Sequence, residues 1–124
     1  MSSINYIQLE SEKQNLEELR DYRAACELQK RIIFVREEDP KSTAGDVGDA
    51  YLRLGRYLRI LNETEHAELA FIRSLGLLRI FHGKGHEKVK DAMHQIKELR
   101  ELRARPKSDK IDRRFAEYKR SNKL

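Results

Sequence analysis

The chain has 124 residues but only one cysteine, two prolines and no tryptophan. The single cysteine, Cys26, rules out a disulfide within the chain and is typical of a reducing compartment. No apolar run is long enough to cross a membrane as a helix, and no alternating run predicts a β-strand. The first ten residues lack the basic cluster and apolar core of a signal peptide. We therefore expect a cytoplasmic, all-α protein that does not enter a membrane.

Catalytic and metal-binding patterns are also missing. The glycine-rich segment from His82 to His86 lacks the Gly-Lys-Ser/Thr ending and the preceding strand of a phosphate-binding loop. The two histidines have no cysteine or acid pair at a spacing that would complete a tetrahedral metal site. Ser74 does not lie in a nucleophile elbow. The sequence therefore predicts no enzyme activity, no metal and no cofactor.

Apolar residues recur at helical spacing along most of the chain. They predict five helices and a shorter sixth, over residues 3–19, 21–37, 43–61, 63–81, 87–104 and 109–121. Pro40 and Pro106 should stop the second and fifth helices, because the residue before a proline avoids the helical region.

Three local signals predict how these helices begin and end. Ser42 or Thr43 should cap the helix that follows it. Asn62 and Glu65 have the spacing of a capping box around a tight turn. Gly83 suits a left-handed exit from the fourth helix.

The most informative segment runs from Tyr51 to Phe71. An aromatic residue, a Leu-Gly pair, a second leucine and an Ala-x-x-x-Phe unit follow one another, and these residues should pack two helices together: Tyr51, Leu54, Gly55, Leu58, Ala67 and Phe71. A glycine inside a helix costs about 1 kcal/mol relative to alanine. We therefore expect Gly55 to permit close approach of the second helix, with Ala67 as the small residue facing it.

This pattern resembles the tetratricopeptide repeat, a helix–turn–helix packing unit. The loop that contains Gly83 and His86 is similar to that of the kinesin light chain type of repeat. The resemblance implies antiparallel helix pairs stacked as a short right-handed solenoid. We therefore expect a helical-repeat domain over residues 1–104, and the stop at Pro106 and the basic composition beyond it predict a basic C-terminal helix or tail over residues 105–124.

A period of about 42 residues extends the pattern in both directions. A backward shift places Ala25 where Ala67 stands, whereas a forward shift places Met93 at the position of Tyr51 and Lys97 at that of Gly55. The flanking repeats are therefore degenerate. Solenoids usually need about three repeats to bury a continuous core, so the chain should gain stability from a partner or from self-association.

In this family the first helix of each pair lines a concave groove that binds proteins. The resemblance therefore implies a partner-binding groove formed by Asp49, Leu52, Arg56, Arg59, His94 and Glu98. Leu52 should supply apolar, salt-resistant contact. The function predicted in this way is that of an adaptor, scaffold or complex subunit that binds a peptide, a helix or a larger protein assembly.

Positive charge is concentrated at the C-terminal end. Residues 103–124 contain nine Lys/Arg and three acids, whereas the remainder has 17 basic and 18 acidic residues. Three interpretations of the basic tail are open: a solvated helix, a contact for an acidic protein, or a contact for nucleic acid. Its exposed aromatic residues are too few for a stacking platform. The alternative function is a structural subunit whose tail contacts RNA or an acidic filament through Arg105, Lys107, Lys110, Arg113, Arg114, Lys119 and Arg120.

Overall fold

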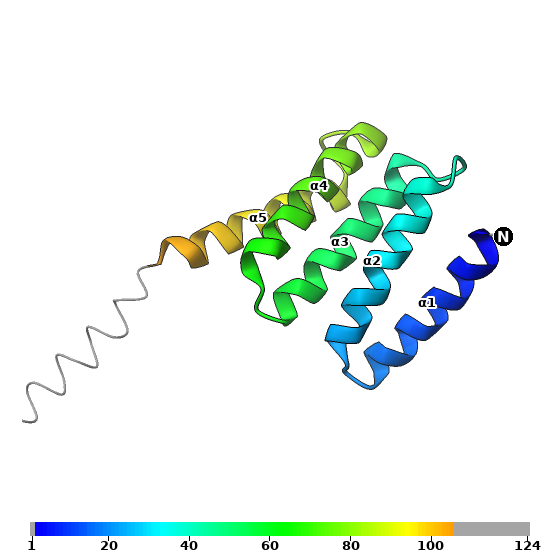
Figure 1. The fold of residues 1–124 in the computed structure, drawn as a ribbon. Coiled ribbons are helices and arrows are strands. Elements are labelled where there is room, and N and C mark those ends of the chain that lie inside the picture. Colours follow the sequence, from blue (N-terminus) through cyan, green and yellow to red (C-terminus); the bar gives the residue numbers. More distant parts are fainter. Residues whose placement is uncertain (1, 106–124) are drawn as a thin grey trace, which may run out of the picture.

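The computed structural model describes residues 2–105, with side chains from Ile7 onward. This part of the chain forms five α-helices and no strand: α1 (Ser2–Glu18), α2 (Tyr22–Glu38), α3 (Ala44–Ile60), α4 (Thr64–His82) and α5 (Glu87–Ala104). Each helix packs against the next one in the chain (Figure 1). The predicted all-α fold of packed neighbouring helices is confirmed, and no helix of the described residues is long and apolar enough to cross a membrane.

The helix boundaries repeat with the predicted period. A shift of 42 residues takes the start of α1 at Ser2 to the start of α3 at Ala44, and the start of α2 at Tyr22 to the start of α4 at Thr64. This regular spacing is consistent with a helical-repeat architecture.

The start of α3 carries the strongest local cap. Thr43 Oγ1 accepts a hydrogen bond from the Asp46 amide at 3.1 Å, and the Asp46 carboxylate accepts one from the Thr43 amide at 3.0 Å. Thr43, not Ser42, is therefore the N-cap residue. The hydrogen bond from the Thr43 amide lowers the pKa of the Asp46 carboxyl group. Asp46 therefore stays charged at neutral pH.

The turn between α3 and α4 differs from the prediction. Asn62 has a positive φ of 62°, and its amide donates to the Arg59 carbonyl while the Glu63 amide donates to the Leu58 carbonyl at 2.8 Å. This is the Schellman arrangement that ends a helix. The predicted capping box of Asn62 with Glu65 is wrong, because Asn62 serves to close α3, and the N-cap of α4 is Glu63 without a side-chain bond.

The α3–α4 pair has the most extensive contact of the described helices. Leu54, Leu58, Ala67 and Phe71 are buried in it. Tyr51 packs at the edge of the cluster. Its hydroxyl donates a hydrogen bond to the Glu37 carboxylate of α2 at 2.5 Å.

Gly55 lies against an aromatic ring. A Cβ added there would come within 2.6 Å of Phe71 Cε1, and the three nearest atoms all belong to this ring. The expectation that Ala67 faces Gly55 is therefore wrong. The antiparallel register also places Gly48 against Leu78, and the same register puts Ala67 level with Arg59, one turn away from Gly55.

Candidate functional site

The first helix of each pair contributes to one hollowed face of the protein. A groove of about 910 Å³ runs along this face between α1 and α3 and reaches the first turns of α5. Three of the predicted groove residues line it: Asp49, Leu52 and Arg56. Arg59, His94 and Glu98 lie outside this lining, further along α3 and α5.

Leu52 does not supply an exposed apolar contact. It is only 6% exposed and belongs to the buried core cluster, so the predicted role of its side chain in binding is wrong. The exposed apolar side chain of the groove is instead Ile7 of α1.

The floor of the groove is polar. Gln29 of α2 is 1% exposed, and its Nε2 donates a hydrogen bond to the Ala50 carbonyl at 2.9 Å. Its Oε1 has no hydrogen-bond partner among the described residues. Lys13 of α1 is 3% exposed and binds Glu10 at 2.7 Å. Gln29 and Lys13 thus place polar side chains in the buried layer beneath this face.

Lys13 and Gln29 were missed in the sequence interpretation, although a signal for them was present. A 42-residue shift takes Lys13 to Gly55 and Gln29 to Phe71. The tight Gly–Phe contact of the second pair is therefore replaced in the first pair by two long polar side chains. This substitution places polar groups under the groove between α1 and α3.

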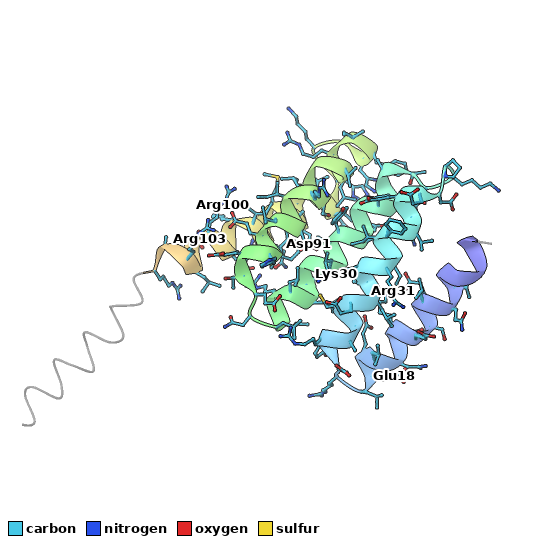
Figure 2. All side chains as sticks on the ribbon, viewed as in Figure 1. Glu18, Lys30, Arg31, Asp91, Arg100 and Arg103 are labelled. Carbon is cyan, nitrogen blue, oxygen red and sulfur yellow. The ribbon has the colours of Figure 1, made fainter. Side chains whose placement is uncertain are left out.

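Ion pairs connect the helices that line this face. Arg53 of α3 lies 3.7 Å from Glu17 of α1, and Lys88 of α5 lies 2.9 Å from Asp49. Arg56 of α3 pairs with Asp91 of α5, which is labelled in Figure 2. Pairs this exposed contribute about 0–1 kcal/mol each to the stability of the fold.

The other predicted groove residues form a second cluster. Arg59 binds Glu98 at 3.2 Å and also donates to Gln95. His94 Nε2 lies 3.1 Å from Glu98. The bond from Arg59 lowers the pKa of the Glu98 carboxyl group. The structure thus joins Arg59, His94 and Glu98 to one another and separates them from the groove around Asp49.

The loop between α4 and α5 has a structural arrangement of its own. The rings of His82 and His86 are stacked with centroids 3.8 Å apart. His86 is the N-cap of α5, and its Nδ1 accepts a hydrogen bond from the Lys88 amide at 3.1 Å. Burial lowers the pKa of His82. Among the described residues, no group of three His, Cys, Asp or Glu side chains is placed to hold a metal ion.

The predicted basic tail lies almost wholly outside the described residues. Arg105, the last described residue, is the C-cap of α5. Arg103, which was counted with the basic segment, lies inside α5 and donates to the Glu68 carboxylate at 2.7 Å. The remaining predicted tail residues lie beyond Arg105: Lys107, Lys110, Arg113, Arg114, Lys119 and Arg120.

Comparison of the chain with protein-family models, with curated proteins and with solved structures found no match.

Proposed function

We propose that this protein is a non-enzymatic interaction module of the tetratricopeptide type, which binds a segment of a partner protein in the groove between α1 and α3. The observation that carries this proposal is an open groove of about 910 Å³ that is walled by α1 and α3 and lined by charged side chains such as Glu17, Asp49 and Arg56.

Charge around the groove supports a partner segment of mixed charge. Glu17, Asp49 and Asp91 alternate with their basic partners along the wall. A segment that carries both signs can replace these exposed pairs without leaving either sign uncompensated.

We further propose a cytoplasmic location, where thiols stay reduced. Cys26 is a free, buried cysteine, and burial raises the pKa of its thiol. A buried neutral thiol behaves as a small apolar residue of the core.

Two neighbouring substitutions test the groove. Gln14 lines it, and Asn15 is an exposed residue of the same helix that does not. Partners captured from native extract by the wild-type chain should be lost with Gln14→Trp, because the indole fills the groove, and retained with Asn15→Trp. Helical circular dichroism of both variants checks that the fold is intact. Equal capture by the two variants would contradict binding in this groove.

A second candidate function rests on the uneven charge of the chain. In this alternative the protein is a structural subunit whose tail contacts RNA or an acidic filament. The full-length variant R113Q/R114Q/K119Q/R120Q should then lose capture, whereas Gln14→Trp should retain it. Binding to duplex nucleic acid would fall with salt at a log–log slope of about 0.9 per phosphate neutralised. Groove binding predicts the opposite pattern between the two variants.

A further inference from the structure

The outer face of α4 carries an apolar stripe that nothing in the described part of the chain covers. Leu69, Ile72, Gly76 and Ile80 follow one another at intervals of three or four residues, so they share one side of the helix. Leu69 is 64% exposed, Ile72 40% and Ile80 80%. A Cβ added at Gly76 would meet no atom within 4 Å. The stripe therefore has a gap at Gly76, between two exposed isoleucines.

The fold itself does not require this stripe. The 42-residue shift places Glu27, Lys30, Phe34 and Glu38 of α2 at the equivalent positions. Three of these four are charged, as expected for a surface that faces water. The second pair thus replaces a solvated surface with an apolar one, and contiguous exposed apolar surface marks interaction sites.

The neighbouring face of α5 is basic. Glu68 of α4 accepts hydrogen bonds from Arg100 and Arg103 at 2.7 Å each, and Figure 2 shows both arginines on the last turns of α5. These contacts set an antiparallel register in which Lys97 is level with Ile72.

The same register places Lys90 level with Ile80, with the exposed Met93 between the two lysines. Lys90, Met93 and Lys97 lie at i, i+3 and i+7, on one side of α5. The helix presents Asp91, Gln95 and Glu98 to α3 on a different side.

Positive charge exceeds negative charge around the stripe. The exposed Lys/Arg residues of α4 and α5 are Arg73, Arg79, Lys88, Lys90, Lys97, Arg100 and Arg103, whereas the exposed acids are Glu65, Glu87 and Glu101. An apolar strip with a basic border is complementary to an amphipathic helix whose apolar side is flanked by acids.

We propose that this α4–α5 surface, formed by the α4 stripe together with Lys90, Met93 and Lys97, docks an acidic amphipathic helix of a partner protein. The stripe from Leu69 to Ile80 is about 16 Å long at 1.5 Å per residue, which matches three turns of a bound helix. An apolar residue of that helix would enter the gap at Gly76, and its flanking acids would face the basic border.

The chain's own C-terminal segment has the wrong charge for this surface. Residues 106–124 contain seven Lys/Arg and three acids. Like charges brought together at an interface oppose binding. Charge therefore favours an acidic partner over this segment.

Two synthetic helical peptides test the proposal by fluorescence anisotropy with the full-length protein. Both carry the same leucine stripe, but one has glutamates and the other lysines on its flanks. The acidic peptide should bind and the basic one should not. The double variant Leu69→Gln with Ile72→Gln should weaken binding of the acidic peptide by about tenfold or more, because two apolar contacts are lost. Leu19→Gln changes an exposed leucine in the turn after α1 and should leave binding unchanged.

Further variants separate this surface from the other candidate sites. R113Q/R114Q/K119Q/R120Q and Gln14→Trp should each keep affinity for the acidic peptide within about twofold. The test of this surface is therefore independent of the test of the groove between α1 and α3. Affinity that survives Leu69→Gln with Ile72→Gln, or that disappears with the tail variant, would overturn it. So would concentration-dependent self-association abolished by Ile72→Gln, since a second copy would then cover the stripe.

Discussion

Replacing Gly55 with alanine should destabilise the protein, although alanine is the better helix former. The added methyl group would lie 2.6 Å from Phe71 Cε1, 2.7 Å from Cδ1 and 2.8 Å from Cζ. These distances are well below van der Waals contact. Phe71 is completely buried, so its ring can move away only by displacing other core side chains.

Two opposing effects determine the size of the change. Overpacking a well-packed core costs about 1–3 kcal/mol, whereas exchanging glycine for alanine inside a helix stabilises it by about 1 kcal/mol. We expect Gly55→Ala to lower the free energy of unfolding by up to about 2 kcal/mol. Gly55→Leu should lower it further, because the larger side chain cannot be accommodated beside the ring.

Gly76→Ala is the matched control. Gly76 also lies inside a helix, but an added methyl group there meets no atom within 4 Å. This substitution should stabilise the protein by about 0.5–1 kcal/mol. Helix propensity is common to both changes, so the difference between the two variants, about 1–3 kcal/mol, measures the steric contact with Phe71.

Urea unfolding followed by circular dichroism measures both variants. With an m-value of about 1–3 kcal/mol per molar urea, the two midpoints should differ by roughly 1 M at unchanged m. A double variant, Gly55→Ala with Phe71→Leu, should show a coupling of about 0.5 kcal/mol or more, because the smaller side chain relieves the clash. If Gly55→Ala were as stabilising as Gly76→Ala, the proposed close approach of α3 and α4 would be refuted.

Five further substitutions test helix ends and the α4–α5 contact. Thr43→Ala should cost about 1 kcal/mol through loss of the capping box, whereas Ser42→Ala should change stability little; an equal effect in urea unfolding would contradict the assignment of Thr43 as the cap. Asn62→Gly should be neutral or stabilising and Asn62→Ala destabilising by about 1 kcal/mol, because Asn62 has a positive φ; the reverse order of melting temperatures would exclude this turn. Hydrogen bonds from Arg100 and then Arg103 lower the pKa of Glu68, so its contribution to stability is present above the unfolded-state pKa of about 4.3 and is lost as the pH falls through the lower folded-state value. Glu68→Gln should therefore lower the melting temperature at pH 7 and flatten its decrease between about pH 5 and pH 3; parallel curves for both proteins would contradict this role.

The helices and their spacing could be predicted from the sequence because their causes are local. Apolar residues three or four apart define a helix face, and Asp39 before Pro40 ends α2 at Glu38. The 42-residue period was readable for the same reason, since each helix of the first pair recurs in the second. Thr43 could be named as one of two caps, but the choice between it and Ser42 depended on the geometry of the turn.

The contacts between helices were decided only by the tertiary structure. Whether Ala67 or Phe71 faces Gly55 depends on how far one helix is shifted along the other, and the helical period contains no information about that shift. The same holds for Leu52, which shares a helix with exposed groove residues but points into the core. Ion pairs such as Arg56 with Asp91 join residues 35 positions apart, and only the packed helices bring them together.

The groove shows which features the sequence indicated and which the tertiary structure decided. The resemblance of the sequence to tetratricopeptide repeats implied which helices would line a common face. The polar floor under that face arose from Lys13 and Gln29, residues that read in isolation as ordinary surface side chains. Their burial is a property of the interface between α1, α2 and α3, where neighbouring backbones exclude water from side chains that a single helix would leave exposed.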